Sequence, residues 1–147
     1  ALLNDGENSI VHSAISQNEL LKKYYESDIA LHVEGLDIKN RLITRTSFST
    51  KIVDCLTSGC ATMAICWGKQ AGYTYLKKEN AAICIDNTAD IKLKLLQIVK
   101  DPNILTEYRN RAFKCLERNH QKKHVLNQIT NDFNEIMGRQ IYESPAS

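Results

Sequence analysis

Residues 47–61 read SFSTKIVDCLTSGCA, and this run decides how the rest of the chain is interpreted. A polar loop leads into a short helix expected over residues 50–58. Gly59 can end that helix, because glycine readily adopts the left-handed conformation. Residues 61–66 are then continuously apolar, which is typical of a strand buried on both faces of a parallel sheet. The run therefore predicts a helix that crosses over into a buried parallel strand.

Helices and strands alternate on both sides of this run. The expected strands cover residues 10–14 (weak), 28–33, 61–66 and 81–85. The other expected helices cover residues 16–25, 70–78, 88–100, 104–119 and 122–137. This order predicts an α/β fold, namely a Rossmann-like parallel sheet with flanking helices and two extra C-terminal helices.

The expected domain organisation is simple. Residues 1–138 are predicted to form one Rossmann-like domain, with residues 34–48 irregular and polar, and residues 139–147 are predicted to be a disordered tail. The chain starts with Ala1, and four strands are few for a doubly wound domain. We therefore expect these 147 residues to be a fragment of a longer protein.

Composition excludes several classes of protein. A net charge of +2 gives no indication of nucleic-acid binding, and the chain lacks 18 consecutive apolar residues that could span a membrane. The five cysteines form no Cys-x-x-Cys pair, so no zinc site is expected. An odd number of cysteines without a secretory signal favours a reduced, cytoplasmic protein.

The start of the helix in this run has the features of an anion site. Ser49 is the expected N-cap, which places Thr50 and Lys51 in the first turn. A lysine at this end opposes the helix dipole, and a bound anion would reverse that unfavourable interaction. Ser49, Thr50 and backbone N–H groups could then bond phosphate oxygens, with Lys51 as a point charge.

Asp54 completes the candidate site. The spacing places Asp54 on one helical face with Thr50 and Lys51, opposite a buried face formed by Ile52, Cys55 and Leu56. A carboxylate one turn below a diphosphate can accept hydrogen bonds from ribose hydroxyls. The alternative interpretation is a capped surface helix whose Lys51 and Asp54 form a solvated pair.

Residues 19–86 resemble the C-terminal, nucleotide-sugar-binding half of GT-B glycosyltransferases of group 1, especially bacterial enzymes that build capsule or lipopolysaccharide sugars. The resemblance rests on the segments 24–31, 50–59, 60–66 and 75–82. Its core is the Lys-x-x-acid-x-Leu-x-x-Gly motif that runs from Lys51 to Gly59.

The resemblance assigns roles to individual residues. It implies that Asp54, standing where Glu is commoner, holds the donor ribose. It also implies that Ser47, Ser49 and Thr50 stand in the place of the family's phosphate-binding loop and contact the donor diphosphate, with Lys51 beside them.

Other positions depart from the family pattern or match it weakly. Thr46 stands where many retaining members carry a Glu, which argues against a retaining mechanism, and Glu34 could substitute only if its loop folds back. The turn that binds the base would fall at Ser13 and Ala14. No catalytic residue is assigned.

The resemblance implies an activity as well. A full-length enzyme would move a sugar from a nucleoside-diphosphate sugar to a glycan or lipid-linked acceptor in surface polysaccharide synthesis, without a metal or other cofactor. The N-terminal acceptor-binding domain would be a missing partner of these residues, so the fragment alone would be inactive. Nucleic acid is not an expected partner. The expected location is the cytoplasm, including the inner face of the membrane.

Three alternatives remain open at this point. Basic residues in the late helices could rest on an anionic membrane, although interspersed acids favour a solvated face. A nucleotide-sugar epimerase would need carboxylate and histidine groups in its cleft, for which His12 and His32 are the early candidates. The chain could also be a non-catalytic scaffold that keeps the fold.

Overall fold

The computed structural model describes residues 4–142 of the chain. The first half contains α1 (Gln17–Tyr25), β1 (Ile29–Val33), α2 (Ile38–Thr44), α3 (Lys51–Thr57) and β2 (Ala61–Ile65). The second half contains α4 (Ala71–Lys78), β3 (Ile83–Ile85), a 3₁₀ turn (Thr88–Asp90), α5 (Ile91–Lys100), α6 (Asn103–Asn119) and α7 (Lys122–Tyr142).

The described strands form one parallel sheet in the order β1-β2-β3. Ile29 lies opposite Ala61 at the start of the first pair, and Met63 lies opposite Ile83 at the start of the second. Helices flank this sheet, so the chain has an α/β fold whose arrangement is consistent with a Rossmann-like fold. Every residue of β2 is buried, as the apolar run 61–66 predicted for a central strand.

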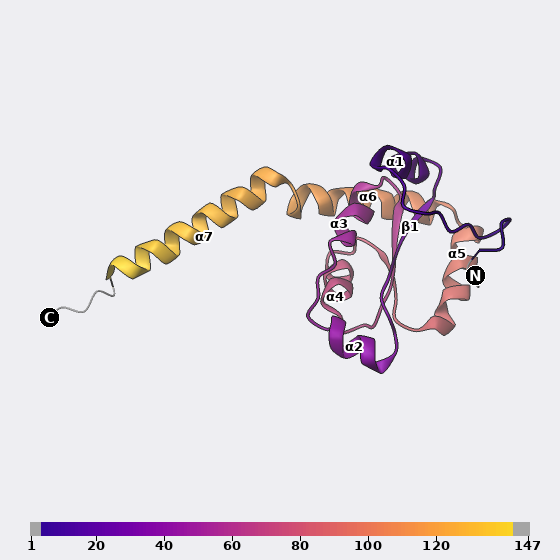
Figure 1. The fold of residues 1–147 in the computed structure, drawn as a ribbon, viewed down its shortest axis with the longest axis horizontal. Coiled ribbons are helices and arrows are strands. Elements are labelled where there is room, and N and C mark those ends of the chain that lie inside the picture. The colour runs from indigo at the N-terminus through magenta and orange to yellow at the C-terminus, as the bar shows by residue number, and fades with distance from the viewer. Residues whose placement is uncertain (1–3, 143–147) are drawn as a thin grey trace.

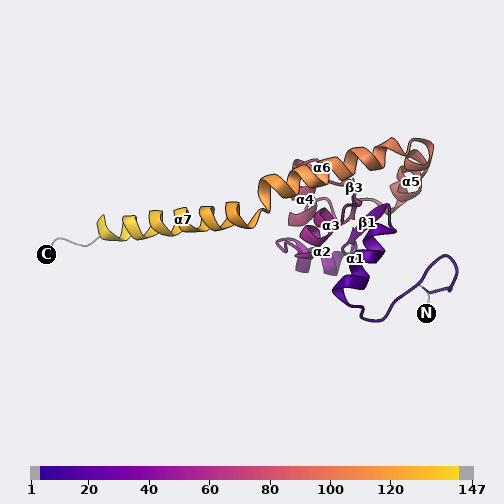
Figure 2. The same cartoon turned by 90° about the horizontal axis from the view of Figure 1, so that it is seen from above.

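Two hydrophobic clusters cover the two faces of the sheet. The first joins α3, α4 and α6 to β2, and its members include Ile52, Leu56, Tyr73, Leu76 and Cys115. The second joins β2 and β3 to α5 and the start of α6, and its members include Met63, Ile65, Ile83, Ile85 and Ile98. Figures 1 and 2 show α3 and α4 on one side of the sheet, α5 on the other, and α6 reaching across both.

Local sequence signals explain the helix ends. Ser16 and Glu19 form the expected capping box at the start of α1. Gly59 follows α3 with a φ of +78°, the left-handed conformation in which glycine is favoured. The expected helix and strand around residues 50–66 are therefore confirmed, with α3 burying Ile52, Cys55 and Leu56.

Two predictions for the first half were wrong. Residues 10–14 form no strand, because no neighbouring strand pairs with them, and the side chains of Ile10 and Val11 are more than half exposed. Residues 34–48 are not wholly irregular, because α2 forms there behind an Asp37 cap that accepts from the Asn40 N–H at 3.1 Å. Its apolar residues Ile38 and Leu42 are four positions apart but largely exposed, so α2 buries none of its residues.

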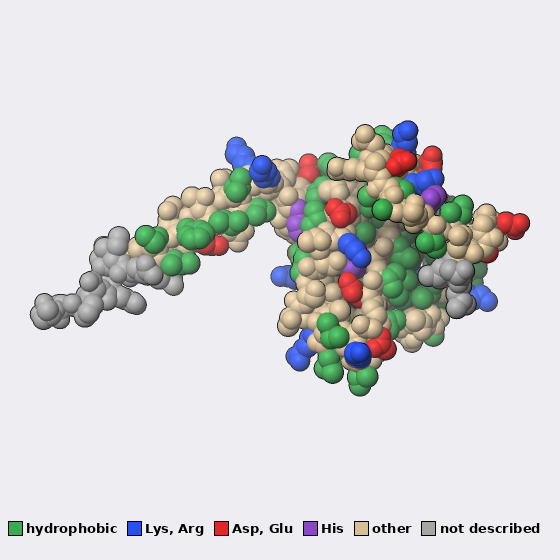
Figure 3. All heavy atoms as spheres, in the orientation of Figure 1, with side chains coloured by type: hydrophobic (Ala, Val, Ile, Leu, Met, Phe, Trp, Pro, Cys, Tyr) green, Lys and Arg blue, Asp and Glu red, His purple; other side chains and the backbone are tan. Residues whose placement is uncertain are grey.

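The last helix, α7, extends away from the rest of the molecule (Figures 1 and 2). It runs to Tyr142, past the end expected near residue 137, while residues 143–147 of the expected tail lie outside the described residues. Figure 3 shows hydrophobic side chains along it. Leu126, Ile129 and Phe133 of this helix are exposed. Within residues 4–142, none of the helices combines the length and apolar character needed to cross a bilayer.

Candidate functional site at the carboxyl edge of the sheet

The carboxyl ends of the parallel strands define the edge where ligands bind in open α/β sheets. Glu34 directly follows β1 there, and its N–H donates to the Ile65 carbonyl at 3.1 Å, which extends the pairing of β1 with β2. In Figure 1, α2 lies beyond this edge, whereas α1 and α6 lie toward the opposite, amino edge. The loop from α2 into α3 therefore passes over the carboxyl edge.

The exposed face of α3 carries the residues predicted to bind a ligand. Thr50, Lys51 and Asp54 are exposed, and the face opposite to them is buried, as the spacing predicted. Among the described residues, Lys51 and Asp54 form no ion pair with each other or with any other side chain. Exposed side chains at Lys51 and Asp54 fit both the ligand site and the alternative of a solvated surface helix.

The predicted N-cap at Ser49 was wrong. Thr50 is the residue that caps α3, with helical backbone angles and no hydrogen bond from its side chain to the helix. The chain enters α3 through a tight turn, in which the Ile52 and Val53 N–H groups already donate to the Ser49 and Thr50 carbonyls at 3.1 Å. Those two N–H groups are consequently occupied within the chain.

A buried glutamine holds the loop in front of α3. The Gln70 Oε1 accepts from the Tyr73 N–H at 2.9 Å and caps α4, while the Gln70 Nε2 donates to the Ser47 carbonyl at 3.2 Å. The next residue, Phe48, packs edge-on against Tyr75 with ring centroids 5.2 Å apart. Both contacts fix the backbone of the loop and leave the Ser47 hydroxyl exposed.

A second pair of contacts ties α2 to the connection after β2. The Arg41 guanidinium lies 5.9 Å from the ring centre of Trp67, a cation–π distance. The Ala71 N–H donates to the Arg45 carbonyl at 3.1 Å. These contacts hold the whole 34–50 segment over the carboxyl ends of β1 and β2.

His32 and Glu34 meet at the end of β1. The His32 side chain is buried, and its Nε2 lies 3.9 Å from the Glu34 Oε1, too far for a hydrogen bond. The Nε2 has no hydrogen-bond partner among the described residues. Burial is the largest cause and lowers the pKa of His32; the Glu34 carboxylate raises this pKa, and the Lys51 ammonium, the smallest cause, lowers it.

The residues expected to hold a base lie elsewhere. His12 and Ile15 line a hollow together with Glu19 and Lys22 of α1. Ser13 and Ala14 lie between His12 and Ile15, so they belong to the segment beside α1 rather than to the carboxyl edge. The structure therefore places Glu34 just after β1 and Lys51 at the start of α3, whereas Ser13 and Ala14 lie beside α1.

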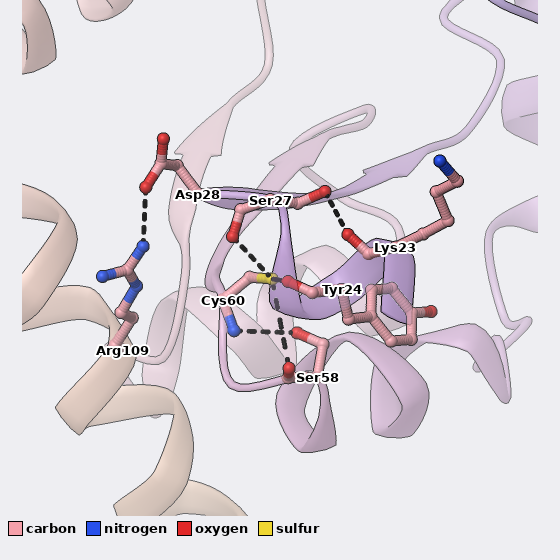
Figure 4. A network of polar contacts seen from close by, with 7 residues as sticks. All are labelled: Lys23, Tyr24, Ser27, Asp28, Ser58, Cys60 and Arg109. Carbon is pink, nitrogen blue, oxygen red and sulfur yellow. Dashed lines mark hydrogen bonds and ion pairs between the residues drawn. The ribbon is translucent and has the colours of Figure 1, made fainter. Parts of the chain in front are cut away.

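The amino edge of the sheet contains a polar network of its own, drawn in Figure 4. The Cys60 thiol contacts the carbonyls of Tyr24 and Ser27 at 3.2 and 3.3 Å, and the Arg109 guanidinium bonds the Asp28 carboxylate at 2.8 Å. A cavity of about 500 Å³ opens beside this network, lined by residues of α1, α3 and α6. Because the contacts join α1 and α6 to the strand starts, we interpret the network as structural.

Sequence reasoning missed Gln70 and the His32–Glu34 pair. Ser, Thr, Asp and Asn are the usual N-cap residues, so the cap that Gln70 provides for α4 was not signalled by its residue type. The bond from Gln70 to Ser47 and the approach of Glu34 to His32 depend on tertiary geometry. Within residues 4–142, no group of three or more His, Cys, Asp or Glu side chains is arranged to hold a metal ion.

We compared the chain with protein-family models, with curated proteins and with solved structures, and none of the three comparisons gave a match.

Proposed function

We propose that this chain is the donor-binding half of a GT-B glycosyltransferase, which moves a sugar from a nucleoside-diphosphate sugar to a glycan or lipid-linked acceptor in surface polysaccharide synthesis. The observation that carries the proposal is the exposed face of α3, where an unpaired lysine and an unpaired carboxylate lie one turn apart. Such a pair can bind a group that is anionic at one end and rich in hydroxyls at the other.

The proposed contacts follow from the donors that remain available. The hydroxyls of Ser47, Ser49 and Thr50 make no hydrogen bond within the described part of the chain. In the proposal they bond the diphosphate oxygens, and Lys51 supplies the positive charge. Asp54 accepts hydrogen bonds from the ribose hydroxyls. The occupied N–H groups of Ile52 and Val53 take no part.

Sugar transfer also requires an acceptor site, which in this proposal belongs to a separate N-terminal domain. The chain alone is therefore expected to bind the donor weakly and to transfer no sugar. A thermal-shift series with UDP, GDP, TDP and CDP tests the binding part, because a ligand that binds only the folded state raises the melting temperature. Stabilisation by none of these nucleotides in a protein that contains the complete domain would favour a non-catalytic scaffold.

Replacing Asp54 tests the assignment of the ribose contact. Loss of a hydrogen bond to a charged group costs about 1.5–3 kcal/mol, so Asp54→Ala should weaken nucleotide binding by roughly tenfold or more in a calorimetric titration. Its stability should stay within about 0.5 kcal/mol of the parent, because Asp54 is exposed and unpaired.

Asp132→Ala provides the matched control, since it removes an exposed aspartate from α7, away from the carboxyl edge. This control should bind nucleotide like the parent. An Asp54→Ala variant with unchanged affinity would show that the ribose lies elsewhere.

A nucleotide-sugar epimerase is the second candidate, because His32 and Glu34 lie together at the same edge and could serve as acid and base. The buried position of the His32 Nε2 makes this candidate the weaker one. Product analysis on the full-length enzyme separates the two: an epimerase changes the sugar while it stays on the nucleotide, and a transferase releases the nucleoside diphosphate.

A further inference from the structure

The helix α7 carries a continuous row of exposed apolar side chains. Figures 1 and 2 show the helix extending away from the rest of the molecule, and Figure 3 shows hydrophobic side chains along it. Six large apolar residues, each between 38% and 64% exposed, make up this apolar stripe: Val125, Leu126, Ile129, Phe133, Ile136 and Met137. Helices in proteins gain most of their stability by packing an apolar face, so the stripe indicates a partner.

The spacing within the apolar stripe is that of a coiled-coil seam. Leu126, Ile129, Phe133 and Ile136 follow one another at intervals of three, four and three residues. Apolar residues at these intervals occupy the a and d positions of a heptad and lie along one side of a helix. A second helix with the same row fits against such a seam, because the side chains of each row fill the gaps in the other.

The charges of α7 favour a protein partner over an anionic surface. Lys122 and Lys123 at its start are balanced by Asp132 and Glu135 further along, so residues 122–138 carry no net charge. Most of the other polar residues of α7 are Asn, Gln and Thr. Helices that rest on anionic membranes carry many Lys and Arg residues on the polar face, which α7 lacks over residues 122–138. Two copies of α7 can therefore approach each other without net repulsion.

We infer that the apolar stripe of α7 is an interface between two copies of this chain, which pair through α7 as an antiparallel two-helix coiled coil. The inference is independent of the proposed sugar-nucleotide site on α3. In the antiparallel pair, Leu126 packs against Ile136 of the second copy, and Ile129 packs against Phe133 of the second copy. Each phenyl ring thus meets a smaller side chain, whereas a parallel pair would place the two Phe133 rings against each other.

The position of α7 in the molecule also favours the antiparallel direction. The helix leaves the rest of the molecule at its N-terminal end, so an antiparallel pair places the two folded bodies at opposite ends (Figures 1 and 2). It directs Lys122 and Lys123 toward the C-terminal half of the second helix, which carries Asp132, Glu135 and the negative end of the helix dipole. A parallel pair would gather both bodies and all four lysines at one end.

The area of the apolar stripe is sufficient for a specific dimer. Its six side chains are about half exposed. With about 200 Å² for each large apolar residue when fully exposed, a pair of helices buries roughly 1,200 Å², the lower end of the range for specific interfaces. Interfaces of this size have a Kd in the micromolar range when they contain few polar contacts.

Sedimentation equilibrium of the chain tests the pairing. We expect a reversible monomer–dimer equilibrium with a micromolar Kd. Phe133→Glu should weaken it by at least about thirtyfold, because a carboxylate replaces the largest side chain of the seam. Phe133 is exposed in the single chain, so the variant keeps its folded body. Phe113→Glu makes the same change at a 54% exposed residue of α6 and should leave the Kd unchanged.

A spin label at Lys122→Cys measures the direction of the pair. This added thiol is exposed, whereas the five native cysteines are buried or half-buried and react more slowly. With a rise of 1.5 Å per residue, the two labels should lie roughly 27 Å apart along the helix axis in the antiparallel dimer. Labels about 10 Å apart, as in helices packed side by side in parallel, would overturn the antiparallel arrangement.

The remaining outcomes identify the occupant of the apolar stripe. A chain that stays monomeric up to its solubility limit, or a dimer that Phe133→Glu leaves intact, overturns the interface and leaves the donor site untouched. Flotation with phosphatidylglycerol vesicles tests a bilayer as the occupant, and we expect no binding. Vesicle binding that Phe133→Glu abolishes would assign the stripe to a membrane and overturn the dimer.

Discussion

Single side chains hold the loop before α3 in place, and Gln70 is the main one. It has no exposed surface, and its amide bonds the helix start of α4 on one side and the Ser47 carbonyl on the other. An amide can make both bonds because it carries a donor and an acceptor. A carboxylate at this position would accept from Tyr73 and repel the Ser47 carbonyl.

The buried cysteines give a prediction at the same scale. Burial raises the pKa of Cys55 and Cys66 to about 11 and that of Cys84 to about 12. Only the thiolate reacts rapidly, so at pH 8 roughly a thousandth or less of each thiol is reactive. Ellman's reagent should label these three cysteines slowly in the native protein and rapidly in guanidinium, with the labelled peptides identified by mass spectrometry. Equal rates in both conditions would contradict the burial.

The sequence was most informative where a contact is local. The shared face of Thr50, Lys51 and Asp54 follows from helical spacing and was predicted correctly. The unpartnered Nε2 of His32 could not be predicted, because its environment combines side chains from β1, the loop after it and α3.

At the scale of the secondary-structure elements, Gly59 gives a sharp test of how α3 ends. Its φ of +78° strains any residue with a Cβ, although the space around it is open. Gly59→Ala should therefore lower the free energy of unfolding by about 1 kcal/mol in urea denaturation. Gly138→Ala on α7 is the matched control, because the same added methyl also meets open space but within a helix.

The control should leave stability unchanged or raise it by up to about 1 kcal/mol, since alanine is the better helix former. A Gly59→Ala variant as stable as Gly138→Ala would mean that α3 ends without the left-handed residue.

The sheet strands and α3 were predictable from their buried faces and α1 from its capping box, whereas α2, which buries no residue, was missed. The strands β1 to β3 and the helix α3 bury apolar residues in a regular pattern, so their positions were anticipated. The helix α2 is held by its Asp37 cap, by the contact of Arg41 with Trp67 and by the bond from the Ala71 N–H to the Arg45 carbonyl. None of these contacts depends on a periodic pattern of buried apolar residues. Residues 10–14 have the apolar composition of a strand but no partner, so composition alone misled the prediction.

At the scale of the whole molecule, buried His32 and half-buried His120 predict how stability depends on pH. Burial lowers the pKa of His32 and of His120, although a nearby glutamate raises each in part. The unfolded chain, where histidine titrates near 6.5, then binds protons more readily than the folded chain. The free energy of unfolding should therefore fall as the pH drops from 7.5 through 6.5 to 5.5.

Urea denaturation at these three pH values measures the effect. His32→Gln and His120→Gln should each flatten the pH dependence, while His12→Gln replaces an exposed histidine and serves as control. His120 also accepts from or donates to the Tyr75 hydroxyl at 2.7 Å, so its variant will lower stability at all pH values. A stability that rises toward pH 5.5 would contradict the burial of both rings.

The path of α6 has a consequence for cooperativity. Its first turns contribute Ile104 and Tyr108 to the cluster with α5, and its later turns contribute Ala112 and Cys115 to the cluster with α3 and α4. Displacing α6 would expose apolar surface on both sides of the sheet at once. Local unfolding on one side of the sheet alone would therefore cost nearly as much free energy as unfolding both. Hydrogen exchange of the amides of α6 and β2 should therefore report one common free energy of opening, equal to that of global unfolding of the domain.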